Sequence, residues 1–552
     1  MRYSALAAAV ILSILAACGA EPADTGPAAP AQALPDGAMY YLVLEDPAAV
    51  LEAVDGYLAQ GAPALGQGVA SEWTLNALNC ASFDELSTRF GLDPRGTLVL
   101  FQKGMGNSFG LAVQVTDAQA VWANLEQMGM QVSEGEEIEG LPVREVIVAG
   151  ALPLKMAVKR DVLIAAVSRP LLSEMAGLLD SARAELPVPE LDSGTLYMSI
   201  NFAAIAPILS AQMPMIRQQA LAGMQAGEEP QPQAIIDIMG LYFDAFGVVV
   251  NQTRDVRWML TMGTETATSR MWMTFKEGSD LERLLGPLEI EDLSSEIPAG
   301  ELMMARASLN PDLGREVTGA FAQALGFTPD SAMMRMAEAF SRNTAVSIMS
   351  PLEGSIFHMV AVYEIGEDLT LDEVATGMSS MVEMASSITD SMPMVITEPE
   401  MVEIDGRTYM SYGQSFQAPE GEGGGLDFSM SFWLTKQDGM LYLESAPEPT
   451  VIPQLLDGTW QGESAAESGR LDYPDDYEMA FAMDVGAYMS AMMQLSAGQS
   501  DIPPEVMQAM GQHQLWIRSG IDMNEDGMLC ESTVNGADLV SFIMGIVTMA
   551  SQ

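Results

Sequence analysis

The sequence predicts an internally duplicated α+β fold with antiparallel sheets and helices packed on one face. Three observations support this prediction. A turn, strand and helix unit in residues 34–58 returns three times, and turn motifs recur in the same order in both halves of the chain. In addition, alternating apolar residues such as Trp258, Leu260 and Met262 are typical of half-buried antiparallel strands.

The first unit begins with Leu-Pro-Asp-Gly at 34–37, where Pro fixes one dihedral angle and Gly allows positive φ. Residues 39–44 favour a strand, and Asp46 before Pro47 predicts the N-cap of a helix. Similar units are expected at 191–209, 297–317 and 471–495.

Later motifs also come in pairs. Thr-x-x-Gln at 116–119 and Thr-x-x-Glu at 370–373 have the spacing of capping boxes that begin helices. Glu-Ile-Glu-Gly at 137–140 corresponds to Glu-Ile-Asp-Gly at 403–406, and the turn at 159–161 corresponds to that at 436–439. The preserved order indicates a duplication.

The 552 residues exceed what one hydrophobic core normally fills, so two or more domains are expected. We place the two halves at 34–290 and 291–552. The first half should contain apolar helices at 203–224 and 234–246 and a strand at 246–250, and the second should contain strands at 515–523 and 528–534.

The N-terminus has Arg2, an apolar run from Ala5 to Leu15, and Leu-Ala-Ala-Cys at 15–18. These residues resemble the lipobox of bacterial lipoproteins. The resemblance implies a signal peptide at 1–17, a lipid anchor on Cys18 and a flexible tether at 18–33. Gly19 after the cysteine then implies the outer membrane, with the body facing the periplasm or the exterior.

The strand-rich repeat and the Gly-Leu-Asp-Pro turn at 91–94 make the body similar to a family of uncharacterised bacterial envelope proteins, known as a domain of unknown function. That resemblance implies no catalytic residues.

Composition excludes some functions. With 24 Lys and Arg against 75 Asp and Glu, the net charge of −51 repels nucleic acid and anionic lipid head groups. Neither a cofactor-binding motif nor a metal-binding Cys or His pattern occurs, so we predict no cofactor.

The 43 methionines cluster around Met213, Met334 and Met378. Because Met side chains adapt to many shapes, these clusters either fill the core or line a pliable cavity for a lipid or another apolar ligand.

Gly-Asn-Ser-Phe-Gly at 106–110 fits the G-x-S-x-G pattern of serine hydrolases, with Ser108 as nucleophile and His358 or His513 as base. That motif needs a strand before it and a helix after it. Here a strand is expected at 111–115, which favours a hairpin turn.

Two further features could be sites. Asp522, Asn524 and Asp526 match the start of a calcium loop, although Thr533 replaces its final Glu and strands replace the helices, so a hairpin turn is the alternative. Cys80 and Cys530 could form a disulfide in an oxidising compartment.

Together, these observations predict a non-enzymatic, lipid-anchored envelope protein with a binding or structural interaction role. The first alternative is a carrier of lipid or another apolar ligand through a Met-rich cavity. The second alternative is a serine hydrolase using Ser108.

Overall fold

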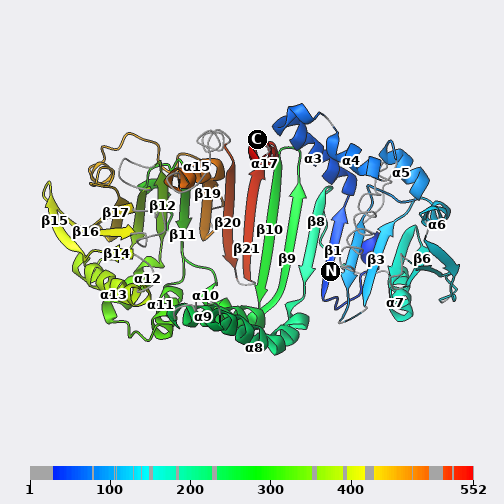
Figure 1. Cartoon of the computed structure of the whole chain (residues 1–552), viewed down its shortest axis with the longest axis horizontal. Helices are drawn as coiled ribbons and strands as arrows, with labels where there is room; N and C mark the ends of the chain where they lie inside the picture. The colour runs from blue at the N-terminus through cyan, green and yellow to red at the C-terminus, as the bar shows by residue number, and fades with distance from the viewer. Residues whose placement is uncertain are drawn as a thin grey trace. The chain divides into compact units, whose positions relative to one another are not determined.

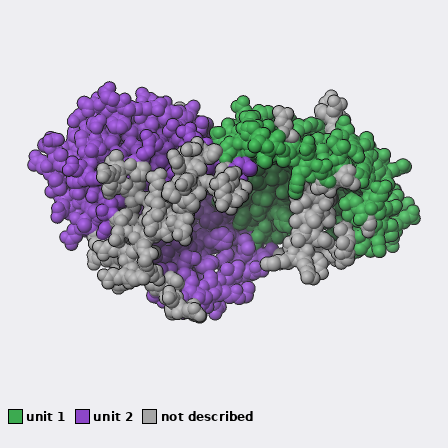
Figure 2. Space-filling model, turned by 45° about the horizontal axis from the view of Figure 1, so that its top comes forward, with its two compact units in different colours: residues 1–205, 254–273, 535–541 green, residues 206–253, 274–534, 542–552 purple. Residues whose placement is uncertain are grey.

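The computed structural model describes residues 29–550 except 67, 78–79, 105, 107, 129, 139, 148–152, 182–185, 227–232, 351–356, 390–393, 417–427, 475–476, 497–513 and 525–526. These residues form two compact units, which Figure 2 colours separately. Unit 1 comprises the chain up to Ile205, Arg254–Met273 and Asn535–Ser541, and unit 2 comprises Ala206–Thr253, Thr274–Val534 and the residues from Phe542 onwards.

Unit 1 contains an antiparallel sheet with the strand order β10-β9-β8-β1-β2-β3-β7-β6-β5-β4 (Figure 1). The strands are β1 (Tyr40–Glu45), β2 (Leu98–Gln102), β3 (Phe109–Gln114), β4 (Gln131–Glu134), β5 (Arg144–Ile147), β6 (Leu154–Lys159), β7 (Val162–Ala166), β8 (Thr195–Ile200), β9 (Thr253–Met262) and β10 (Thr266–Phe275).

Unit 2 repeats this order as β21-β20-β19-β11-β12-β13-β18-β17-β16, and both β14 and β15 pair with β16. Its strands are β11 (Met303–Ala307), β12 (Thr344–Met349), β13 (His358–Glu364), β14 (Met394–Ile396), β15 (Glu400–Ile404), β16 (Arg407–Phe416), β17 (Phe428–Gln437), β18 (Met440–Ser445), β19 (Met479–Asp484), β20 (Trp516–Asn524) and β21 (Gly527–Asn535). The α+β class, the antiparallel sheets and the internal duplication are therefore as predicted.

The helices of unit 1 are α2 (Ala29–Gln32), α3 (Pro47–Gly61), α4 (Val69–Ala77), α5 (Phe83–Phe90), α6 (Ala118–Gln127), α7 (Arg169–Asp180) and the start of α17 (Gly536–Ala550). Leu86 of α5 and Val121 of α6 pack with Leu111 on one face of the sheet, whereas Leu172 of α7 packs with Ala112 on the other. Neighbouring residues of one strand thus belong to two cores, because strand side chains alternate between faces.

The helices of unit 2 are most of α8 (Phe202–Ala226), α9 (Gln233–Gln252), α10 (Asp280–Leu284), α11 (Pro311–Ala324), α12 (Ser331–Phe340), α13 (Leu371–Thr389), α14 (Ile452–Leu456) and α15 (Val485–Ser496). Met336 of α12 and Val374 of α13 pack with Ala361 on one face of the sheet, and Ile452 of α14 packs with Val360 on the other. Each face again has its own core. The predicted packing of helices on one face is therefore wrong, because helices cover both faces of each sheet.

The compact units follow a different division from the sequence halves 34–290 and 291–552. Helices α8–α10 precede residue 290 but belong to unit 2, where Arg283 Nη2 of α10 lies 2.8 Å from Glu316 Oε1 of α11. Conversely, Ser541 Oγ of α17 donates to the Gly61 carbonyl of α3 within unit 1, over 2.9 Å. Each unit therefore includes a segment from the other half of the duplicated sequence.

The flexible tether predicted at 18–33 is wrong at its C-terminal end. Residues 29–32 form helix α2, and Ala31 and Ala33 are fully buried in the core that contains Leu172 of α7.

One predicted strand is wrong. Residues 246–250 continue helix α9, which ends at Gln252, and β9 starts at Thr253. The β-branched Val248 and Val250 favour strands only weakly. In the structure they belong to a helix that packs against α11, where the ring of Tyr242 lies edge-on to Phe321 with centroids 6.3 Å apart.

Candidate functional site: a groove between helices α8 and α9

Helices α8 and α9 line an open groove of about 730 Å³ within unit 2. Its wall is mainly apolar. The lining residues are Ser210, Met213, Pro214, Arg217, Gln218 and Leu221 of α8, and Phe243, Asp244, Gly247, Val248, Val250, Asn251 and Gln252 of α9. Lining positions in α8 recur three or four residues apart, because these spacings share one face of a helix.

Four polar side chains of the groove are paired with one another. Arg217 Nη1 donates to Asp244 Oδ1 over 2.8 Å, and Ser210 Oγ donates to Asn251 Oδ1 over 2.7 Å. Asn251 Nδ2 in turn donates to the Gly247 carbonyl over 2.8 Å. The bonds of Arg217 and Ser210 join α8 to α9 and leave the apolar part of the groove wall open.

Gly247 leaves room in this wall. A Cβ added at Gly247 would have no atom within 4 Å, so this position opens onto unfilled space. At Gly240, by contrast, an added Cβ would lie 3.2 Å from Arg217 Nη2. The volume and the mainly apolar wall are typical of sites for small apolar or amphipathic ligands.

The two helices are unusually exposed for their composition. The described residues of α8 and α9 include three charged side chains, Arg217, Asp237 and Asp244. Residues 235–252 of α9 are long and apolar enough to cross a membrane by length and composition alone, yet only 17% of that segment is buried. A composition typical of a core or membrane helix is therefore found on the surface of unit 2.

The three methionine clusters do not converge on one cavity. Met213 lines the groove, but Met378 packs in the core that contains Met336 and Val374. Met334 lies in α12, between the fully buried Met333 and Met336. One of the three predicted methionine positions thus indicated the groove. The sequence analysis missed the Arg217–Asp244 pair, because this pair can be predicted only if α8 and α9 are known to be neighbours.

Ser108 lies in a hairpin turn between β2 and β3, as the second strand predicted. Its Oγ donates to the Gly104 carbonyl over 2.7 Å. His358 is in the other unit, where its Nε2 lies 3.0 Å from Glu444 Oε1, and His513 lies outside the described residues. Strand β2 precedes the turn, but β3 follows it where the hydrolase motif needs a helix, and no described histidine is bonded to Ser108.

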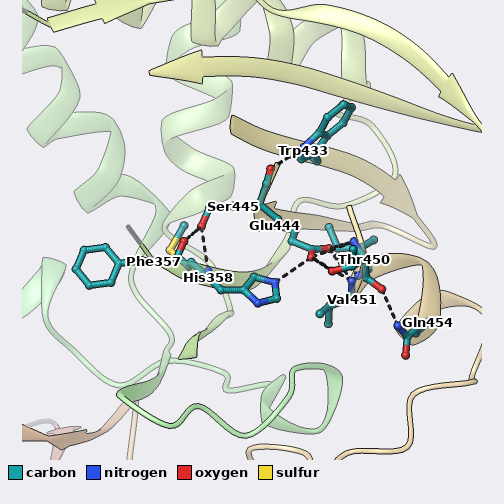
Figure 3. A network of polar contacts seen from close by, with 11 residues as sticks. Phe357, His358, Trp433, Glu444, Ser445, Thr450, Val451 and Gln454 are labelled. Atoms are coloured by element: carbon teal, nitrogen blue, oxygen red, sulfur yellow. Dashed lines mark hydrogen bonds and ion pairs between the residues drawn. The ribbon is translucent and has the colours of Figure 1, made fainter. Parts of the chain in front are cut away.

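His358 and Glu444 form a buried pair that no sequence motif indicated (Figure 3). Glu444 also accepts hydrogen bonds from the amides of Thr450, Val451 and Ile452 at the start of α14. Burial raises the pKa of Glu444, but the bonds from His358 and these amides outweigh it and lower the pKa overall. An ionised Glu444 can only accept, so His358 Nε2 donates.

The calcium-loop candidate is a hairpin. Asp522 and Asn524 lie at the end of β20. Strands β20 and β21 pair antiparallel, and the pair nearest the turn is Asn524 and Gly527. Asp526 lies outside the described residues. Asn524 Nδ2 donates to Asp522 Oδ2 over 3.2 Å. Within the described chain, no group of three or more His, Cys, Asp or Glu residues is arranged to hold a metal ion.

Cys80 and Cys530 do not form the disulfide considered from the sequence. Cys80 is buried in the core of unit 1 with Leu75 and Leu86, and Cys530 lies on β21 opposite Ile521 in unit 2. Burial raises the pKa of both thiols. The proposed lipid anchor, Cys18, lies outside the described residues.

Comparison of the chain with protein-family models, curated proteins and solved structures gave no match. The function is therefore inferred from the chain's own residues and from the geometry of the groove.

Proposed function

We propose that this chain is a non-enzymatic, lipid-anchored protein of the bacterial cell envelope that binds an acyl chain or a similar apolar group between α8 and α9. The groove of about 730 Å³ is the observation that carries this proposal. The lipobox-like leader supports an anchor on Cys18, with the body held at the outer membrane and facing the periplasm or the exterior.

The wall of the groove favours an apolar ligand over a charged one. Arg217 and Asp244 neutralise each other across the helices, so the site has no spare cation to balance an anionic ligand. Transfer of an apolar chain from water to such a wall contributes about 0.8 kcal/mol per buried methylene group. Micromolar binding corresponds to about −8 kcal/mol, so about ten or more buried methylenes are needed, because association also costs translational and rotational freedom.

Titration with phenylnaphthylamine, an uncharged fluorescent apolar probe, tests the groove. We expect saturable binding by the non-acylated mature chain. Gly247→Leu should weaken that binding at least about tenfold, because the new side chain occupies the unfilled space at this position.

Gly223→Leu is the matched control. Gly223 is also a helical glycine at which an added Cβ meets nothing within 4 Å, but it does not line the groove. The control should bind as the wild type does. Absence of saturable binding by the wild type, or equal loss in both variants, would overturn the proposal for the groove.

The anchor has its own test. Mass spectrometry of the protein purified from membranes should show an N-terminus at Cys18 carrying acyl chains, and Cys18→Ser should release the protein from the membrane fraction. A mature N-terminus upstream of Cys18, or one without acyl chains, would contradict the anchor and leave the groove test unaffected.

A further inference from the structure

Helix α9 is apolar on several sides and is nevertheless exposed. Tyr242, Phe246 and Val248 are 57%, 51% and 43% exposed, and at about 100° per residue these positions do not share one stripe of the helix. A surface helix of a water-soluble domain normally confines its apolar residues to one buried stripe, whereas a helix that is apolar all round is found in a core or a membrane.

Helix α8 extends this apolar surface. Met215 and Ile216 are 55% and 40% exposed and do not line the groove. Val317 of α11, a helix that α9 contacts, is 46% exposed. In Figure 1, α8 and α9 run beside each other next to α10 and α11. Large apolar side chains are thus exposed on adjoining helices of one unit.

We infer that the α8–α9 helix pair inserts into the apolar layer of a lipid bilayer that has electrically neutral head groups. Residues 235–252 have a mean hydropathy of 1.3 and the length of a membrane helix. Two acids lie in this segment. Asp244, a charge that would be unfavourable in lipid, is paired with Arg217 at 2.8 Å, as charged side chains in apolar surroundings usually are. Asp237, near the start of the segment, accepts a hydrogen bond from Gln233 Nε2 over 2.8 Å.

The net charge of the chain favours a neutral bilayer on this surface over a second copy of the chain or an anionic bilayer. A second copy of the chain would bring together two bodies with a net charge of −51 each, and this repulsion opposes self-association through an uncharged surface. An anionic bilayer would be repelled in the same way, since Arg217 is the single basic residue in the described parts of α8 and α9. A bilayer of neutral lipids has no net charge, so neither repulsion opposes its contact with this surface.

Insertion is distinct from ligand binding in the groove, because Tyr242 and Phe246 do not line the groove, although Val248 does. Met215 and Phe246 lie outside the groove lining and are more than half exposed. Their substitution should therefore affect membrane binding without filling or removing the ligand site.

Flotation of the full-length mature chain carrying Cys18→Ser, with vesicles of phosphatidylcholine, tests the inference free of any lipid anchor. We expect this chain to float with the vesicles. Adding Met215→Glu and Phe246→Glu should lower its partition coefficient at least about tenfold, since two charges must then leave water. Phosphatidylglycerol in the vesicles should also reduce binding.

The matched control places Glu at Leu65 and Trp73, which are 44% and 76% exposed in unit 1. This control and Gly247→Leu should both float as the parent does, and circular dichroism should show that all variants are folded. Failure of the parent to float, or equal loss in the control, would overturn the inference. So would a dimer in sedimentation that Met215→Glu and Phe246→Glu convert to monomer, because a second copy would then cover the surface.

Discussion

The two units begin an equivalent helix in different ways. Gly110 pairs with Ala166 in unit 1, and Val360 pairs with Glu444 in unit 2, so Ala166 and Glu444 occupy equivalent positions at the ends of β7 and β18. In unit 1, Ser168 caps α7 locally by accepting from the amide of Leu171.

In unit 2 the N-cap position of α14, Val451, has no capping side chain. Instead, Glu444 of β18 reaches the amides at the start of the helix from within the core, and His358 of β13 holds its other side (Figure 3). The unpaired backbone amides at the start of equivalent helices can therefore be satisfied either by the side chain of a neighbouring residue or by a buried charge from the sheet.

The same registers relate two residues of the hydrolase hypothesis to each other. Counting two residues back from Gly110 and Val360 makes Ser108 and His358 equivalent positions of the two repeats. A nucleophile and its base need to converge on one site, whereas these two residues are counterparts in separate units.

The largest difference between the units should appear when the two caps are removed. Glu444→Ala should lower the free energy of unfolding by about 3–5 kcal/mol, because three helix amides and His358 lose a buried charged partner. Ser168→Ala should lower it by about 1 kcal/mol, the usual effect of losing a local cap. Urea denaturation followed by circular dichroism measures both; equal losses would mean that Glu444 acts only as an ordinary cap.

Acidic pH should reduce the stabilisation that Glu444 provides. The pKa of Glu444 in the folded protein lies below its ordinary value of 4.5, so its contribution is complete above that value and is lost as the pH falls through the lowered pKa. Wild type and Glu444→Gln should therefore differ in unfolding free energy by a constant amount above about pH 5, and this difference should shrink in more acidic buffer.

The difference between wild type and Glu444→Gln does not include the contributions of other carboxyl groups to the pH dependence. Burial raises the pKa of Glu478 in unit 2, so its contribution changes in the opposite direction, and it cancels in the comparison because both proteins contain it. A difference between wild type and Glu444→Gln that does not change with pH would show that the Glu444 carboxylate has no special stabilising role.

Local signals in the sequence predicted the frame of both units. Asp46 caps α3 as expected, and Thr370 and Glu373 form the predicted capping box, with Glu373 N donating to Thr370 Oγ1 over 3.2 Å. In the first half the capping box at Thr116 is wrong, because the adjacent Asp117 caps α6. Adjacent residues with similar capping ability compete, and backbone geometry decides between them.

The candidate sites depend on contacts that a single sequence does not contain. His358 and Glu444 are 86 positions apart, and Arg217 and Asp244 belong to different helices. Hydrophobic periodicity predicted α8 and α9, but the length of α9 was wrong because its β-branched residues favour strands locally. Packing against α11 decides the outcome there, and such tertiary effects exceed local propensity.

The smallest predicted effect concerns the hairpin turns before Ala166 and Glu444. Lys159 pairs with Val162 across Arg160 and Asp161, and Gln437 pairs with Met440 across Asp438 and Gly439. All four turn residues have positive φ, as in a type I′ turn, but unit 2 has glycine at the second position where unit 1 has Asp161.

Exchanging that residue should shift stability in opposite directions in the two units. Asp161→Gly should raise the free energy of unfolding by up to about 1 kcal/mol, and Gly439→Asp should lower it by a similar amount, because non-glycine residues are disfavoured at positive φ. Thermal unfolding of the two variants measures both shifts. Shifts of the same sign would show that side-chain contacts of the turn, and not its backbone conformation, set its stability.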